Sequence, residues 1–309
     1  MFSNLYQLLI LKKPRIVFLV LILIASFFLY NTKDFRLDAS SDTLLIEGDP
    51  DLEYLKEINQ RYKSKDFLVL TFTPKEALTS ESSINNILSL KYKIQSLDWV
   101  YNVVTILDVP LLESSDEPLM DRIKNFRTLK DENIDRNRAF NEIINSPVFK
   151  NLVISEDATT TGIIVNLKRK KVLESSAFDN EKEFEEYKDK LKTKNHENIK
   201  EIRGIIDSFK NIGKIHLGGI PMIADDMMTF IKKDIIVFGI GVLSFIIITL
   251  WFVFKKILWI TIPISSCFFA VIIMIGFLGL MNWKVTVISS NFIAMMLILT
   301  MAMNIHIST

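Results

Sequence analysis

Apolar residues are concentrated in long runs at the two ends of the chain, and polar residues dominate the region between them. One run, Ile16 to Tyr30, lies near the amino terminus. Three more follow one another at the carboxyl end, Ile235–Phe254, Ile257–Met281 and Val285–Ile307, and contain no Asp, Glu, Lys or Arg. Each of these three reaches the roughly 20 residues that a helix needs to cross the hydrocarbon core of a bilayer. The pattern therefore predicts a membrane protein with one span, a large polar insert and three further spans.

The first run is shorter than the others, so a secretory signal peptide is an alternative interpretation. Such peptides carry basic residues in front of the apolar run, and Lys12, Lys13 and Arg15 occupy that position. No small-x-small cleavage site follows Tyr30, however. We therefore interpret this run as an uncleaved helix that begins near Pro14.

Basic residues in the short flanks predict the orientation, because they stay on the cytoplasmic side of the membrane. The cluster before the first run places the amino terminus in the cytoplasm and the polar insert outside. Lys255 and Lys256, between the second and third spans, then lie in the cytoplasm as well. The predicted domains are residues 1–30 with the first helix, residues 31–234 outside, and residues 235–309 with helices two to four.

Strand and helix patterns alternate within the insert. Runs rich in β-branched and aromatic residues predict strands, whereas apolar residues spaced by three and four predict helices. The expected strands are Phe67–Phe72, Val100–Leu107, Thr160–Leu167 and Lys214–Leu217. The expected helices are one from about Ser80, one from Asp179 to Phe209, and one around Arg138–Ile144 inside an insertion from Val109 to Ser155. This order predicts a ferredoxin-like unit, with both crossover helices on one face of a four-stranded sheet, and hence an α+β membrane protein.

Charge and composition exclude several classes of function. Lys and Arg together number 37 and Asp and Glu 36, and this balance argues against a nucleic-acid partner, which usually requires a basic excess. The single cysteine, Cys267, excludes an intramolecular disulfide and a cysteine metal cluster. The histidines His196, His216 and His306 are far apart, and no nucleophile elbow, phosphate loop or metal-binding His pair is present. We therefore expect no enzyme activity, no cofactor and no metal site.

Acidic residues after the first helix could form either a cation site or a linker. Hard cations bind converging carboxylates. These residues lack the glycine-fixed spacing of a calcium loop, so a solvated linker is the favoured interpretation. The residues are Asp38, Asp42, Glu47, Asp49 and Asp51.

Small and polar residues in the last two spans are expected mainly to pack helices. Ser289, Ser290 and Asn291 form a polar cluster in the fourth span, and such side chains let helices approach and hydrogen-bond. Lining a substrate or ion path is the alternative for this cluster. Gly276 and Gly279, in the third span, are interpreted as ordinary packing points.

Charged residues mark the boundary between the insert and the second span. Asp225 and Asp226 come first, and Lys232, Lys233 and Asp234 follow at the edge of the apolar run. We expect Asp225 and Asp226 to form a hinge that transmits motion between the insert and the helix.

Several motifs together resemble a known family. An acidic stretch from Leu37 to Asp49 follows the first helix and precedes Asp66-Phe67-Leu68-Val69. The later motifs are Ser146-Pro147-Val148-Phe149, Leu152-Val153-Ile154-Ser155 and Gly218-Gly219-Ile220-Pro221, the last followed by Asp225-Asp226. With the order of one helix, an outer domain and three helices, the chain resembles the amino-terminal half of exporters of the resistance-nodulation-division (RND) superfamily. The resemblance is to the MMPL branch, which includes lipid and hopanoid exporters and is related to Patched-like proteins.

The resemblance implies an exporter that couples a proton gradient to the movement of hydrophobic or lipid-like molecules. The resemblance also implies a protein built of two similar halves, each with one helix, a periplasmic porter domain and five more helices. The chain stops at Thr309, at the edge of the fourth span, so we expect an amino-terminal fragment whose partner is the missing carboxyl-terminal half. The other expected partners are membrane lipids, the apolar substrate and further copies in a homodimer or homotrimer. The expected location is a bacterial inner membrane.

Proton coupling in this family depends on ionisable groups in the fourth helix, often an Asp followed by an aromatic residue. The matching segment, Met301 to His306, contains no carboxylate. Asn304 cannot titrate, whereas His306 can. Because His306 is close to the cytoplasmic edge, interfacial placement or a helix-helix hydrogen bond is favoured over a relay. A proton relay or substrate path through Asn291, Asn304 and His306 remains a hypothesis.

A non-transporting protein is the alternative function. It could be a sensor whose outer domain binds a ligand, or a translocation accessory resembling the SecD and SecF components, which share the superfamily architecture. Spans without charged residues fit a route for apolar molecules better than a water-filled ion pore, so the transporter is favoured.

Overall fold

The computed structural model describes residues 13–38, 49–62, 66–113, 126–131, 134–168, 173, 177–286 and 288–308. Lys12, Asp42 and Glu47, which the sequence analysis singled out, lie outside these ranges. The chain divides into two compact units, one of residues 48–225 and one of residues 1–47 together with 226–309. Each unit has its own cluster of buried apolar side chains.

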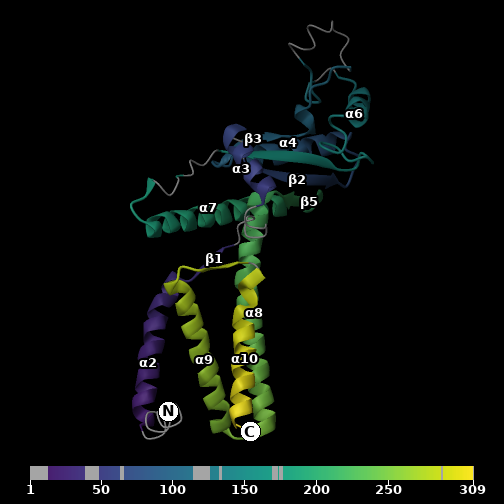
Figure 1. Ribbon diagram of the computed structural model, residues 1–309. Helices are drawn as coiled ribbons and strands as arrows, with labels where there is room; N and C mark the ends of the chain where they lie inside the picture. Colours follow the sequence, from purple (N-terminus) through teal and green to yellow (C-terminus); the bar gives the residue numbers. More distant parts are fainter. Residues whose placement is uncertain are drawn as a thin grey trace. The chain divides into compact units, whose positions relative to one another are not determined.

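The unit of residues 48–225 is built on a four-stranded antiparallel sheet (Figure 1). Its strands are β2 (Phe67–Pro74), β3 (Val100–Val104), β4 (Thr161–Leu167) and β5 (Gly213–Gly218). They are arranged in the order β3-β4-β2-β5. Helix α4 (Glu81–Gln95) connects β2 to β3, and helix α7 (Glu181–Ser208) connects β4 to β5. The boundaries of β2, β4, β5, α4 and α7 agree closely with the sequence-based prediction.

Alternation along the strands buries one face of this sheet. In β2, Leu68, Leu70 and Phe72 are buried, and the β4 residues Ile163 and Val165 are buried beside them. The apolar stripes of α4 and α7 contribute to the same core, because residues three and four apart lie on one face of a helix. Helix α4 starts after Ser80, whose hydroxyl accepts a hydrogen bond from the Ser83 N–H at 3.1 Å.

Strand β3 is shorter than predicted, because a short 3-10 helix, η4 (Ile106–Asp108), follows it directly. The Thr105 hydroxyl accepts a hydrogen bond from the Leu107 N–H, and the Asp108 carboxylate accepts one from the Thr105 N–H at 2.8 Å. This reciprocal cap ends the strand. Ile106 and Leu107 are fully buried in η4. Their apolar side chains extend the pattern of the strand, so the sequence predicts a longer strand than the structure has.

A helix, α3 (Pro50–Tyr62), occupies part of the segment that was predicted to be a solvated linker. The linker prediction is therefore wrong at its carboxyl end, because Asp51 belongs to this helix. The Asp49 carboxylate accepts a hydrogen bond from the Asp51 N–H at 2.9 Å at the start of this helix. Carboxylates near a helix amino terminus are stabilised by its unpaired N–H groups, so acidic residues here mark a helix start.

The insertion between β3 and β4 shares the core of the sheet. Its helix, α6 (Arg136–Asn145), slightly exceeds the predicted range, and the Asp135 carboxylate caps it. Phe140 and Ile143 from α6 belong to the same buried cluster as the strands. The insertion is thus packed against the sheet by its apolar face.

The second unit contains helices long and apolar enough to cross a membrane, and four such helices occur among the described residues. They are α2 (Pro14–Asn31), α8 (Ile220–Phe254), α9 (Ile257–Leu280) and α10 (Phe292–Ser308). Helix α2 begins at Pro14, as predicted. Helix α8 starts well before the predicted Ile235, because it begins in the unit of residues 48–225 and continues without a break through the charged boundary.

The fourth span begins later than predicted, because Val285 belongs to a strand. Strand β6 (Lys284–Thr286) pairs in parallel with β1 (Arg36–Asp38), and a 3-10 helix, η6 (Ile288–Asn291), precedes α10. Val285 is buried opposite Leu37 in this pair. Apolar residues continuous with a span can therefore belong to a strand, and composition does not separate the two.

The glycines of α9 let α2 approach closely. A Cβ atom at Gly276 would overlap the Phe28 carbonyl oxygen, and one at Gly279 would overlap the Asn31 carbonyl oxygen. Both glycines are buried. The interpretation of these residues as packing points is confirmed.

Candidate functional site: an apolar groove between two membrane helices

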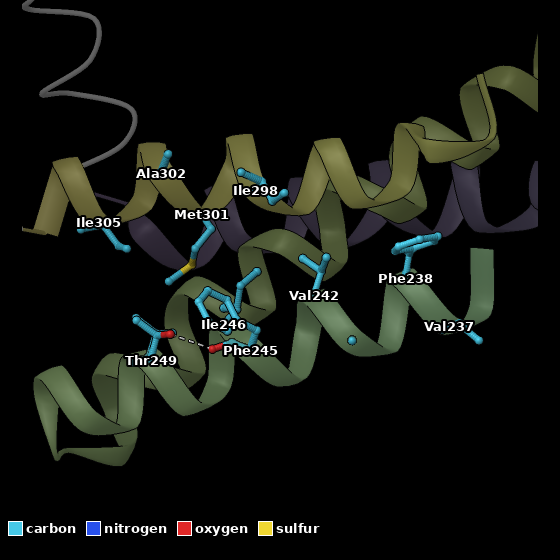
Figure 2. A pocket seen from close by; sticks show the side chains of 12 residues that line it. Val237, Phe238, Val242, Phe245, Ile246, Thr249, Ile298, Met301, Ala302 and Ile305 are labelled. Carbon is cyan, nitrogen blue, oxygen red and sulfur yellow. Dashed lines mark hydrogen bonds between the residues drawn. The ribbon is translucent and has the colours of Figure 1, made fainter. Parts of the chain in front are cut away.

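A groove of about 650 Å³ lies between α8 and α10 (Figure 2). It lies wholly within the unit that holds the membrane helices. Most of its lining comes from α8 and the rest from α10. The lining residues are Val237, Phe238, Gly241, Val242, Phe245, Ile246, Thr249, Leu250, Ile298, Met301, Ala302 and Ile305.

Helical periodicity places these residues on facing stripes. On α8 the lining positions recur every three or four residues, for example Phe238, Val242 and Phe245, and Ile298 and Met301 do the same on α10. Ile246, Leu250 and Met301 are buried, and they join a small core with residues of α9. The groove therefore has a packed floor.

The mouth of the groove is open. Phe238 is 51% exposed, Phe245 69% and Ile298 55% in the isolated chain. At Gly241 a Cβ atom would meet no other atom within 4 Å, so the helix leaves free space there. These residues offer an accessible apolar surface rather than a sealed cavity.

Thr249 supplies the hydroxyl of the lining, and this hydroxyl is used within the helix. It donates a hydrogen bond to the Phe245 carbonyl oxygen at 2.9 Å, as the dashed line in Figure 2 shows. No charged side chain is among the lining residues. Binding sites for small molecules combine apolar walls with placed polar groups, and here the polar groups are nearly missing. The groove thus suits an aliphatic or aromatic surface and offers little to an ion.

The residues predicted for a proton relay or substrate path do not line this groove. Asn304 is half-buried and His306 exposed on α10, on either side of the lining residue Ile305. Asn291 is exposed at the end of η6, about 20 Å along the helix axis from Asn304, taking 1.5 Å per residue. The structure does not bring the three predicted residues together, and the relay stays a prediction.

Asp225 has a partner that sequence reasoning missed. Its carboxylate Oδ1 lies 2.8 Å from His196 Nδ1 on α7, and its side chain is 8% exposed. The neighbouring Asn195 donates from Nδ2 to the Pro221 carbonyl oxygen at 2.8 Å. Asp226, the other predicted hinge residue, is half-buried in the next position. The two contacts attach the start of α8 to α7, and α8 continues as a regular helix through both aspartates.

No sequence signal pointed to this contact, since His196 and Asp225 are 29 residues apart and belong to different elements. The groove was equally hidden, because its residues look like ordinary membrane-facing positions. Within the ranges that the structure describes, no three His, Cys, Asp or Glu side chains are arranged to hold a metal ion.

The fold defines the class of protein: a membrane protein of mixed α and β structure, with an apolar groove between two of its membrane helices. The model of the MMPL family matches residues 186–305, from α7 to near the end of α10. This match confirms the resemblance to the MMPL family and is consistent with a member of the RND superfamily. MMPL proteins are transporters, so the match supports a transporter-type function in general. None of the curated proteins compared with the chain matches it.

Proposed function

We propose that this chain is part of an RND-type exporter that moves hydrophobic or lipid-like molecules, and that the groove between α8 and α10 receives them. The observation that carries the proposal is the chemistry of the groove. Its walls are apolar, and the hydroxyl of Thr249 already donates to the Phe245 carbonyl. Burial of apolar area releases about 25 cal/mol per Å², so such a surface gains most from an apolar molecule.

The unit of residues 48–225 serves as the porter domain in this proposal. The order β3-β4-β2-β5, with α4 and α7 as crossovers, agrees with the order expected of a split βαβ, ferredoxin-like unit, and this agreement supports the assignment. The proposal places it in the periplasm of a bacterium, with the chain crossing the inner membrane and its amino terminus in the cytoplasm. Lys13, directly before α2, and Arg15, in its first turn, support this orientation.

Helix α8 provides the mechanical connection. It begins where Asn195 and His196 hold its first turns and continues to the groove, where Phe238 and Phe245 lie. A continuous helix transmits displacement along its length better than a broken one, so we propose that Asp225 is a fixed attachment rather than a flexible joint. In keeping with the family resemblance, the proton gradient drives the cycle in this proposal, and the relay through Asn291, Asn304 and His306 stays a prediction.

A filled groove should bind apolar molecules less well, and the chain supplies a matched pair of variants. Gly241 lines the groove, whereas Gly239 does not, and a Cβ atom at either would meet nothing within 4 Å. We expect Gly241→Leu to lower labelling of α8 and α10 by a diazirine-bearing fatty acid several-fold in nanodiscs, and Gly239→Leu to leave it unchanged. Mass spectrometry of peptides from residues 237–250 and 298–305 measures the labelling.

If Gly241→Leu is labelled as strongly as the unaltered chain, the groove is not the binding surface. If labelling falls equally in Gly241→Leu and Gly239→Leu, the loss reflects a general change in the helix instead. Circular dichroism of the solubilised chains checks that each variant is folded.

A further inference from the structure

A second pocket, of about 610 Å³, lies at the end of the helix bundle where α9 turns into α10. It is separate from the groove between α8 and α10 and shares no lining residue with it. Its lining has an apolar part, which comes mainly from α9 and α10, and a polar part, which comes mainly from β1, β6 and the residues that flank β6.

The apolar part is supplied by membrane helices. It is formed by Met274 and Leu278 from α9 and by Phe292 from α10. The centroid of the Phe292 ring lies 6.1 Å from the centroid of the Phe35 ring. Trp283, in the turn, also lines the pocket and is 60% exposed. Tryptophan is enriched where the hydrocarbon core meets the polar headgroups. A tryptophan in the lining fits a pocket at the depth where a lipid changes from chain to headgroup.

The polar part is supplied by the parallel pair of β1 and β6. Asp38 and Lys284 both line the pocket. The strand register sets Arg36 beside Lys284 and Asp38 beside Thr286, and residues two apart on a strand share a face. Two cations and one carboxylate are thus gathered on one face of this short ribbon.

We propose that this pocket binds a membrane phospholipid with a phosphoethanolamine headgroup. The phosphate is attracted to Lys284, with Arg36 adding positive charge on the same face, and the primary ammonium donates to the Asp38 carboxylate. Hydrogen bonds in which both partners are charged are the stronger ones. The acyl chain covers Met274, Leu278 and Phe292.

This site goes beyond the proposed function, since it requires only that the helices lie in a membrane. A phospholipid bound here would contact β1, β6, α9 and α10, and would hold together the segment after α2 and the turn between α9 and α10. It is a lipid site distinct from the groove proposed for the transported molecule.

The test is the retention of defined phospholipids by the full chain. The chain is reconstituted in nanodiscs with equal parts of phosphatidylethanolamine, phosphatidylglycerol and phosphatidylcholine, released into detergent, and measured by native mass spectrometry. We expect phosphatidylethanolamine to be retained in preference to the other two. Lys284→Gln should lower retention about fivefold, the effect of one cation near a lipid surface. Asp38→Asn should remove the preference for ethanolamine over choline, whose quaternary ammonium cannot donate a hydrogen bond.

Lys256→Gln is the matched control, because Lys256 lies at the opposite end of α9 and does not line the pocket. Retention equal in Lys284→Gln, Lys256→Gln and the unaltered chain would overturn the proposal. Preferential retention of phosphatidylglycerol that Asp38→Asn leaves unchanged would also overturn it, because the pocket would then select negative charge alone. Thermal unfolding of each variant distinguishes loss of the lipid from loss of the fold.

Discussion

Three charged side chains meet at the start of the insertion, and they show how burial and pairing compete at a single residue. Lys91 Nζ on α4 lies 2.6 Å from Asp108 Oδ1, and Lys130 also donates to this carboxylate. Burial favours the protonated acid. The hydrogen bonds from Lys130, Lys91 and the Thr105 N–H outweigh burial and lower the pKa of Asp108 to about 2.

We predict that Asp108→Asn destabilises the unit of residues 48–225 by about 2 kcal/mol at pH 7, the value that corresponds to this lowering of the pKa. Because the folded pKa lies below the unfolded one, the stabilisation is present above about pH 4 and is lost as the pH falls towards 2. Hydrogen exchange of the amides in α4 and β3, at pH 7 and at the lowest pH the chain tolerates, measures it.

Asp157→Asn is the control for this prediction. Asp157 is exposed, and hydrogen bonds from the Ser155 and Thr159 side chains lower its pKa without burial. Solvent screens such contacts, so its loss should change the exchange rates of α4 and β3 very little. If Asp108→Asn changes the exchange rates as little as Asp157→Asn does, the contacts of Asp108 with the two lysines do not stabilise the unit of residues 48–225.

At the scale of elements, local pattern succeeded wherever one face was buried along a whole element. The alternation in β2 and the three-and-four spacing in α4 placed the start of each element within one residue, and the end of β2 within two. It failed at β3 and at the fourth span, where buried apolar residues such as Leu107 and Val285 continue past the end of the element. The ends there are decided by the cap of η4 and by the pairing of β6 with β1, and periodicity carries no signal of either.

The packing of α2 on α9 gives an element-scale prediction. Gly276→Ala should destabilise the membrane unit by about 1–3 kcal/mol, because the added methyl group would collide with the Phe28 backbone, which cannot move aside cheaply. Gly239→Ala, in open space on α8, should be neutral or stabilising, since alanine favours helix over glycine by about 1 kcal/mol. The thermal unfolding midpoints of the solubilised variants test this, and a shift in the same direction for both would contradict the packing seen here.

At the scale of the whole molecule, hydropathy and tertiary contacts place the domain boundary at different residues. Hydropathy places it where the apolar run begins, at Ile235, whereas the two compact units divide after Asp225, inside the continuous helix α8. The unit that holds the spans also includes β1 and β6, whose pairing joins residues from opposite ends of the chain. A parallel pair this short is recognisable only once its two strands have been brought together.

The orientation proposed for the whole chain can be measured with single cysteines. Cys267 is the one natural cysteine, so Cys267→Ser provides the background. We expect Glu156→Cys, in the loop before β4, to react with a membrane-impermeant maleimide from outside intact spheroplasts. Lys256→Cys, between α8 and α9, should react only after the membrane is opened. The reverse pattern of labelling would invert the topology and remove the periplasmic porter domain from the proposal.

The sequence by itself determined the four apolar helices and the order of the four sheet strands and their two crossover helices, because hydrophobic periodicity and length are local properties. The resemblance to the MMPL family came from separate motifs in the sequence. It could not determine the groove between α8 and α10, since a residue such as Phe245 has the same composition whether it faces a groove or lipid. The contact of His196 with Asp225 and the pairing of β1 with β6 were likewise decided by tertiary structure. Each joins residues far apart in the chain, and only packing sets which distant residues meet.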